Sequence, residues 1–535
     1  MATLMTRLLP TPRPSLFLVL AATIVASAML FPLAYLIIRT AGVGDGTRDL
    51  LLHSRTIRVF VNSALLALAV TIASTFIAVP LAFLTERTDL PGRRFWSVGT
   101  ALPLVIPSYV GSFVIIAALG PKGSILQNWL EPLGIQRLPS IYGWPGALLS
   151  LTLFSYPYIL LTVRASLHAL DPALEESSRC LGHNRWQTFL RVTLPLLKPS
   201  IAAGGLLVAL YTLSDFGTPS LMRFDSFTRV IHVQYQSSFD RSMAAVLSLS
   251  LVGLAGILLL FENLARSRGR YYSLGTGSRR PPETVELGRW RWPALLFCFL
   301  ITGLGLVMPL GVIAYWLVRG LSAGEQLAPV WQLAANSVYV SGLSALVATL
   351  AALPVAFLSV RFPGLLSAIL ERSTYIGFAL PGIVVALSLV FFGVKYTPSL
   401  YQSMAMLIFA YVVLFIPQAV GTIRSSLLQV SPHLEEAAQS LGATHWHAMG
   451  TVTMPLVSPG LLTGASLVFL TTMKELPATL LLAPTGFSTL ATRVWSATDD
   501  AYFARAATPA LLLIGVSALS MMIILSQEKR GDGHG

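Results

Sequence analysis

The sequence has few charged residues, and this scarcity excludes an ordinary soluble protein. Asp, Glu, Lys and Arg make up 11% of the 535 residues, whereas hydrophobic residues make up 54%. Soluble globular domains carry about 25% charged residues. A chain of this composition therefore belongs in a membrane.

Lysine is especially scarce, and the positions of the lysines exclude one way of using ATP. None of the five follows a glycine, so the phosphate-binding loop G-x-x-x-x-G-K-[ST] is absent. We therefore expect no cofactor in this chain and no ATPase site of its own. Any energy that the protein uses must then come from a partner or from a gradient. The five residues are Lys122, Lys198, Lys395, Lys474 and Lys529.

Cysteine is also scarce, and the two cysteines do not suggest a disulfide framework or a metal-thiolate site. Cys180 lies in a polar loop and Cys298 inside an apolar run, so we do not expect them to pair. The net charge of +13 does not indicate a nucleic-acid partner, because the basic residues flank apolar runs instead of lining a groove with interleaved aromatic residues. We expect the arginines of the tract 265–292 to meet anionic lipid headgroups, namely Arg266, Arg268, Arg270, Arg279 and Arg280.

Apolar runs of about 20 residues, the length that crosses a bilayer as a helix, dominate the sequence. They predict an all-α integral membrane protein with twelve transmembrane helices. If the N-terminus is cytoplasmic, the segments on the cytoplasmic side hold more Lys and Arg than the external segments. This bias favours cytoplasmic placement of both termini. The runs are 16–38, 60–84, 96–119, 142–166, 201–221, 243–264, 293–318, 333–358, 373–393, 402–424, 461–482 and 506–526.

The two groups of six runs are copies of one repeat. Residues 171–200 align without a gap with residues 431–460, which lie 260 positions later. Because each copy has an even number of spans, both enter the membrane from the same side and form parallel six-helix repeats. Further matches, 274 positions apart, are Asn62 with Asn336, Ser63 with Ser337, and Pro80 with Pro354. The predicted divisions are a first repeat at 1–264, a cytoplasmic linker at 265–292 and a second repeat at 293–535.

The repeated segment is polar and carries the signals of a short helix. In the second copy Ser431 is a good N-cap residue, and Pro432 suits the first helical position. Glu435 and Glu436 follow where carboxylates favour the positive end of the helix dipole, and Gly442 permits the left-handed residue that ends the helix. The matching residues of the first copy are Asp171, Pro172, Glu175, Glu176 and Gly182.

The tripeptide Glu436-Ala437-Ala438, with Gly442 after it, resembles the EAA loop of binding-protein-dependent ABC importer permeases. The first copy reads Glu176-Ser177-Ser178 and keeps Gly182. This resemblance implies a type I ABC importer permease fold. It also implies that both polar segments are coupling loops for an ATP-hydrolysing subunit.

The same resemblance implies partners and a location. The loops at 171–200 and 431–460 would dock on two cytosolic ATP-binding cassette subunits, which bind the ATP. An external or periplasmic substrate-binding protein would deliver the substrate to a permease in a bacterial inner membrane. The residues expected to couple this chain to the ATPase subunits are Glu175, Glu176, Gly182, Glu435, Glu436, Ala437, Ala438 and Gly442.

Two acidic residues lie at matching positions inside predicted spans. Asp215 and Glu475 are 260 positions apart, and Lys474 precedes the second. An ionisable group within a span costs about 2.5–3.5 kcal/mol on insertion scales, so it faces a bundle interior or a wet cavity and has a partner. One hypothesis pairs Lys474 with Asp215. The other places all three residues on a translocation pathway for a hard cation, without a firmly assigned metal site.

The tracts 215–219 and 473–479, in a chain of fused double length, are similar to those of ferric-iron permeases. This resemblance implies ferric iron as the substrate, with thiamine or another small solute as the alternative. A gradient-driven secondary transporter is a further alternative, but it leaves the duplicated loops unexplained. His183, His445 and His447 are expected at the surface of the loops and not as metal ligands.

Overall fold

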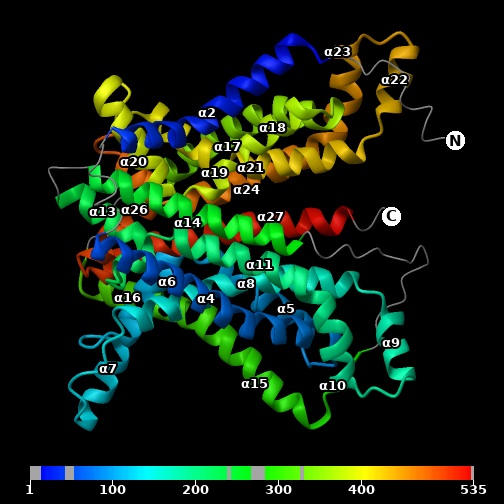
Figure 1. Cartoon of the computed structure of the whole chain (residues 1–535). Coiled ribbons are helices and arrows are strands. Elements are labelled where there is room, and N and C mark those ends of the chain that lie inside the picture. Colours follow the sequence, from blue (N-terminus) through cyan, green and yellow to red (C-terminus); the bar gives the residue numbers. More distant parts are fainter. Residues whose placement is uncertain (1–13, 43–52, 238–241, 267–283, 326–329, 532–535) are drawn as a thin grey trace. The chain divides into compact units, whose positions relative to one another are not determined.

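The computed structural model describes residues 14–42, 53–237, 242–266, 284–325 and 330–531, and they are almost wholly helical (Figure 1). Most of the predicted linker, residues 267–283, lies outside the described residues. Within the described part of the chain, one isolated bridge between Thr88 and Val285 is the sole β pairing. The prediction of an all-helical fold is therefore confirmed.

The helices of the two sequence repeats follow one another in a closely similar order. Those of the first repeat are α2 (Leu16–Ala41), α4 (Ser54–Arg87), α5 (Arg93–Gly99), α6 (Ser108–Leu119), α7 (Ile125–Leu130), α8 (Trp144–Ala169), α9 (Pro172–Cys180), α10 (Arg185–Thr188), α11 (Leu194–Ser214), α12 (Gly217–Leu221), α13 (Phe227–Ser237) and α14 (Ser242–Arg266). Those of the second are α15 (Arg291–Thr302), α16 (Met308–Ser322), α17 (Val330–Arg361), α18 (Leu365–Thr374), α19 (Ile376–Ala379), α20 (Gly382–Tyr396), α21 (Met404–Gln429), α22 (Pro432–Ser440), α23 (His445–Ala448), α24 (Met454–Lys474), α25 (Pro477–Leu482), α26 (Leu490–Asp499) and α27 (Phe503–Gly531).

Nine helical segments among the described residues are long and apolar enough to cross a membrane, or up to eleven if each of two bent pairs is one span. The bends, of 97° and 101°, interrupt the predicted runs 96–119 and 373–393. They occur where Pro107 and Pro381 precede the first residues of α6 and α20. The twelfth predicted run, 506–526, overlaps a shorter apolar helix, Phe503–Leu519.

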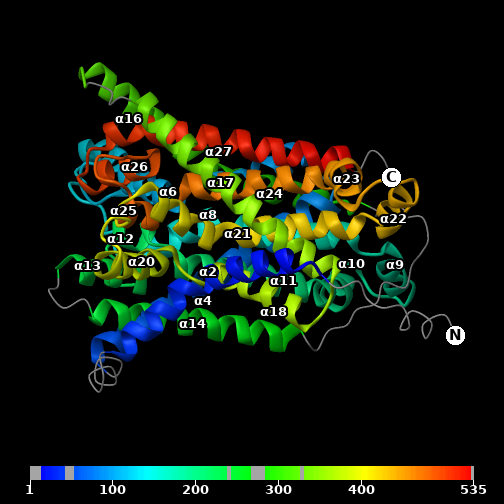
Figure 2. The same ribbon diagram turned by 90° about the horizontal axis from the view of Figure 1, so that it is seen from above.

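The described residues form two compact units that do not coincide with the two sequence repeats. One unit takes its residues from 1–42, 331–492 and 519–535, and the other takes them from 43–330 and 493–518. Each unit thus contains the first long helical segment of the other repeat. In the first unit α21 and α24 run side by side to the loop that holds α22 and α23 (Figure 2).

Side-chain packing explains why α2 belongs with helices of the second repeat. The hydroxyl of Ser388 in α20 donates to the carbonyl oxygen of Pro32 at 2.7 Å. The Tyr35 ring packs edge-on against Phe392 with centroids 5.4 Å apart, and the Arg39 guanidinium lies 4.3 Å from the centre of the Phe391 ring. Local periodicity in the sequence does not predict these long-range contacts.

Candidate functional site

The second polar loop folds as its sequence predicts. The hydroxyl of Ser431 caps α22 by accepting from the His433 amide at 3.4 Å. Gly442 ends the helix with φ of 94°, a conformation that side chains with a Cβ rarely adopt. The Ala443 amide then donates to the Ala438 carbonyl at 3.1 Å, which satisfies one of the free carbonyls at the helix end.

The first polar loop repeats this geometry. The Asp171 carboxylate accepts from the Ala173 amide at 3.0 Å at the start of α9, and Gly182 ends the helix with φ of 87°. In both loops a four-residue helix follows, α10 or α23, and a π-helical turn leads into the next long helix. The π-helical turns are Phe189–Thr193 and Met449–Thr453.

The paired glutamates of the second loop point in different directions. Glu435 accepts from Arg361 and from the Thr453 hydroxyl, both at 2.7 Å, and its side chain is 16% exposed. Glu436 is 68% exposed and contacts His433 at 3.0 Å. Glu435 therefore anchors α22 to its own repeat, which leaves Glu436 at the surface.

In the first loop Glu175 has the anchoring position. Its Oε1 atom accepts from the Thr193 hydroxyl at 2.8 Å, and its Oε2 atom lies 3.8 Å from a guanidinium nitrogen of Arg87. Arg87 is buried at the end of α4 and also donates to the Leu167 carbonyl at 3.0 Å. Arg361 also donates to a carbonyl in the second repeat, that of Val430 at 3.2 Å, although Val430 is not the residue that matches Leu167.

Sequence reasoning missed these anchoring partners, although a signal was present. Arg87 and Arg361 lie 274 positions apart, the displacement of the Asn62 and Asn336 pair, and Thr193 and Thr453 lie 260 apart. We define the coupling seat of each repeat by its arginine, glutamate and threonine. The first seat is Arg87, Glu175 and Thr193, and the second is Arg361, Glu435 and Thr453.

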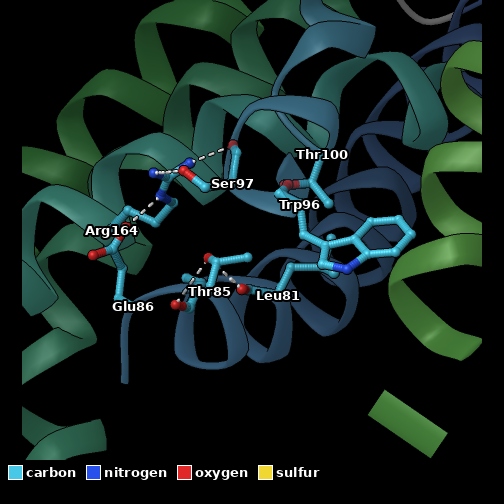
Figure 3. Close-up of polar contacts among 8 residues, drawn as sticks. Leu81, Thr85, Glu86, Trp96, Ser97, Thr100 and Arg164 are labelled. Atoms are coloured by element: carbon cyan, nitrogen blue, oxygen red, sulfur yellow. Dashed lines mark hydrogen bonds and ion pairs between the residues drawn. The ribbon is translucent and has the colours of Figure 1, made fainter. Parts of the chain in front are cut away.

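A second arginine network ties together the helix ends beside the first loop (Figure 3). Arg164 of α8 donates to the Glu86 carboxylate at 2.9 Å, to the Ser97 carbonyl at 2.7 Å and to the Ser97 hydroxyl at 2.5 Å. In the second repeat the matching Arg424 pairs with Glu371 of α18 at 3.1 Å. The carboxylate comes from α4 in one repeat and from α18 in the other, so the ion pair is kept while its donor helix changes.

Both loops expose apolar side chains at matching positions. Leu181 is 80% exposed and Leu441 is 90% exposed, just before the glycines that end α9 and α22. Leu174 and Leu434 are each about half exposed on the same helices. Exposed leucines on a polar loop are suited to contact with another protein.

The histidines of the loops do not form a metal site among the described residues. His183 was expected at the surface, but it is half-buried within its own loop, with Nδ1 3.1 Å from the Ser178 hydroxyl and Nε2 3.0 Å from Arg191. His447 is exposed, as expected. The side chain of His445 lies outside the described residues.

The predicted spans 201–221 and 461–482, which hold Asp215 and Glu475, are each broken at the acid. The preceding helices α11 and α24 end at Ser214 and Lys474, and both acids adopt extended backbone conformations. Each carboxylate caps the short helix that follows, because Asp215 accepts from the Thr218 amide at 2.9 Å and Glu475 accepts from the Ala478 amide at 3.2 Å. A break inside an apolar segment needs such partners for its free amides.

Further hydroxyl groups hold these two breaks. The Ser108 hydroxyl of α6 donates to the Asp215 carboxylate, and the Thr228 hydroxyl donates to the Asp215 carbonyl at 2.7 Å. The Thr479 hydroxyl donates to the Glu475 carbonyl at 2.7 Å. Asp215 and Lys474 belong to different compact units, so their pairing stays a prediction.

The repeated Asn-Ser pairs anchor the segment beyond each break. Asn62 donates to the Asp225 carbonyl at 3.3 Å, and the Ser63 hydroxyl accepts from the first amide of α13 at 2.9 Å. Asn336 donates to the Ser488 carbonyl at 3.0 Å, and the Ser337 hydroxyl accepts from the first amide of α26 at 2.8 Å. The match in sequence is thus a match in structural role.

Two copies of one helical membrane unit, each with a seated polar loop and a carboxylate-capped break, define a permease built from two fused halves. The chain belongs to the family described as binding-protein-dependent transport system inner membrane component, which matches residues 78–270 and again residues 344–530.

Curated relatives include both double-length and single-length permeases. The Fe(3+)-transport system permease protein FbpB 2 of Haemophilus influenzae is 34% identical over 519 residues, which cover 96% of this chain and 98% of that protein. The putative ferric transport system permease protein FbpB 1 of the same organism is 24% identical over 81% of this chain and 71% of its own length. The molybdenum transport system permease protein ModB of Escherichia coli is 32% identical over 34% of this chain and 82% of its own length. These relatives place the chain among multi-pass membrane permeases of bacterial transport systems.

Proposed function

We propose that this chain forms the whole transmembrane part of an ATP-driven importer of ferric iron. The observation that carries the proposal is the pair of coupling seats, which gives one chain two equivalent loops for contact with a motor. The likeness to a ferric permease along nearly the full length of both proteins supports the substrate.

Two cytosolic ATPase subunits are the proposed partners of the loops. Leu181 and Leu441 offer apolar contacts, and Glu176 and Glu436 offer charged ones beside them. Glu175 and Glu435 serve a different purpose, because their contacts with arginine and threonine transmit motion of α9 and α22 to the long helices. This chain supplies no ATPase site, and both of its termini are proposed to be cytoplasmic.

An external binding protein is the proposed source of the substrate. Asp215 and Glu475 are the proposed polar groups of the translocation pathway, and Lys474 is the proposed cation beside them. Carboxylate oxygens suit a hard cation such as ferric iron. Because these acids also cap helix breaks, their loss affects both the fold and any passing ion.

Reconstitution tests the proposal. The chain is inserted into vesicles with its ATPase subunits, and uptake of radioactive ferric iron is measured with the loaded binding protein outside and ATP inside. We expect uptake that requires ATP and survives collapse of the proton gradient. Uptake driven by a proton gradient without ATP contradicts the proposal and supports a secondary transporter.

The ModB likeness favours an oxyanion as the second candidate substrate. Molybdate in place of ferric iron in the same vesicles distinguishes the two. The substitutions Asp215→Asn and Glu475→Gln keep a capping oxygen and remove the charge. Loss of iron uptake with normal assembly then supports a role on the pathway, whereas loss of the assembled protein supports a role in capping alone.

A further inference from the structure

The end of the linker that joins the two repeats lies along the end of α4. The Val285 amide donates to the Arg87 carbonyl at 2.7 Å, and the Asp89 amide donates to the Val285 carbonyl at 3.2 Å. These bonds flank the parallel bridge between Thr88 and Val285. Both segments belong to the same compact unit. The linker therefore has a defined docking position immediately before α15.

The Asp89 side chain fastens the same segment at two further points. Its Oδ1 atom accepts from the Leu287 amide at 2.8 Å, and its Oδ2 atom accepts from Arg291 at 2.8 Å. The Leu287 amide and the Arg291 guanidinium lower the pKa of Asp89 below its ordinary value, because both favour the charged carboxylate. We call Thr88, Asp89, Val285, Leu287 and Arg291 the linker clamp.

The linker clamp adjoins the first coupling seat through one residue. The Arg87 backbone carbonyl accepts from the Val285 amide. The Arg87 side chain donates to the Leu167 carbonyl and lies near the Glu175 carboxylate. The guanidinium has an ion-pair distance of 3.8 Å to Glu175, whereas Arg361 lies 2.7 Å from Glu435 in the second seat. The ion pair of the first seat is therefore longer than that of the second.

The second repeat cannot build this clamp. The residue 274 positions after Asp89 is Pro363, which has neither a carboxylate nor a backbone amide to donate. Among the described residues, no segment forms a bridge with the chain after Arg361 as Val285 does with Thr88. The clamp is therefore one of the features in which the two repeats differ.

We propose that the linker clamp positions Arg87 and thereby fixes the first coupling helix α9, so that the linker sets how tightly the first half is coupled to ATP hydrolysis. Asp89 is a positioning residue in this arrangement. The inference rests on the proposed importer function, and it goes beyond that function because it gives the two halves unequal control.

The test compares substitutions within the clamp in vesicles that contain the full chain with its ATPase and binding-protein partners. Asp89→Ala removes both side-chain bonds, and Val285→Pro removes the amide that donates to Arg87. We expect ferric iron imported per ATP hydrolysed to fall roughly three- to tenfold in each, as for the loss of one or two charge-assisted or backbone hydrogen bonds. ATP hydrolysis itself persists.

Matched variants separate positioning from general damage. Glu286→Gln removes an exposed carboxylate from the same segment and leaves the coupling ratio unchanged. Asp89→Asn keeps an acceptor for the Leu287 amide, so its ratio lies between those of the original protein and Asp89→Ala. Hydrogen exchange of the α9 amides reports how firmly that helix is held, whether or not partners are bound. We expect its rate to rise from the original protein to Asp89→Asn and again to Asp89→Ala.

The possible failures are distinguishable. If the original protein shows no ATP-driven uptake, the proposed function fails. If it shows such uptake and Asp89→Ala and Val285→Pro match Glu286→Gln in both coupling ratio and α9 exchange, the clamp has no positioning role and this inference alone is overturned.

Discussion

The first and second coupling seats hold their loop helices through unequal contacts. In the second, Arg361 binds Glu435 directly at 2.7 Å. In the first, Arg87 lies 3.8 Å from Glu175, and its backbone carbonyl accepts from the Val285 amide of the linker clamp. The two repeats have thus kept the position of the loop helix, while the contacts that hold it have diverged.

The nearby arginine networks have diverged in the same way. Arg164 takes its carboxylate from Glu86 of α4, and Arg424 takes its carboxylate from Glu371 of α18. At a displacement of 274, Glu371 of the second repeat corresponds to Ser97 of the first. Glu86 of the first repeat corresponds to Val360 of the second. What the fold requires is one negative charge beside this arginine, from either helix.

The largest effect is expected from breaking the second seat. Arg361→Ala leaves the largely buried Glu435 carboxylate without its cation, and loss of one partner from a buried pair costs about 3 kcal/mol. We expect ATP-driven uptake to fall at least tenfold, as measured in reconstituted vesicles. Arg372→Ala, which removes an exposed arginine from α18, is the control and should leave ATP-driven uptake unchanged. Equal activity in the two variants would show that the seat transmits nothing.

The next effect concerns the glycines that end the two loop helices. Gly182 and Gly442 have φ of 87° and 94°, and an alanine there costs about 1–2 kcal/mol because its Cβ clashes with the following carbonyl. We expect either alanine variant to lower uptake severalfold, and asparagine, which tolerates this conformation, to lower it less. Binding of the ATPase subunits is the parallel measurement. If alanine and asparagine are equivalent, backbone strain is not the cause.

A smaller effect is expected from exchanging the carboxylate between helices. Glu86→Val removes the partner of Arg164 and should cost about 1 kcal/mol, since the pair is partly exposed. Adding Ser97→Glu copies the second repeat and should recover at least half of that loss. Thermal unfolding of the purified protein measures both changes. Failure of the double variant to recover any stability contradicts the equivalence of the two networks.

The smallest effect is expected from pH acting on the linker clamp. The docked Asp89 has a lowered pKa, so its contribution is fully present above the ordinary value of about 3.9 and is lost as pH falls through the lowered value. The difference in coupling ratio between the original protein and Asp89→Asn should therefore be the same at pH 6 and pH 8. A difference that changes within this range contradicts the assignment.

The sequence was sufficient for the helical membrane fold, the duplication and the local form of each loop. Those features depend on apolar length, on a matched displacement and on caps such as Ser431 and Gly442, all of which are local signals. Contacts between distant segments were not predictable in this way. The packing of α2 with α20 depends on which surface each helix finds, which periodicity alone does not specify.

The candidate site was predicted in part for the same reason. Glu175 and Glu435 were identified as loop residues, but their direction was not, because two adjacent glutamates on a short helix look alike in sequence. Asp215 and Glu475 were identified as buried acids within spans, whereas they cap breaks in their helices. Carboxylates followed within three residues by Gly217 or Pro477 were the available sign of a break.

Labelling from each side of the membrane tests the central claim most directly. Leu181→Cys and Leu441→Cys are made separately in a Cys180→Ser background and treated with a membrane-impermeant maleimide. We predict that both sites react only from the cytosolic side and that bound ATPase subunits protect both. Reaction of either site from the external side, or reaction of the two sites from opposite sides, contradicts an importer driven through two equivalent loops.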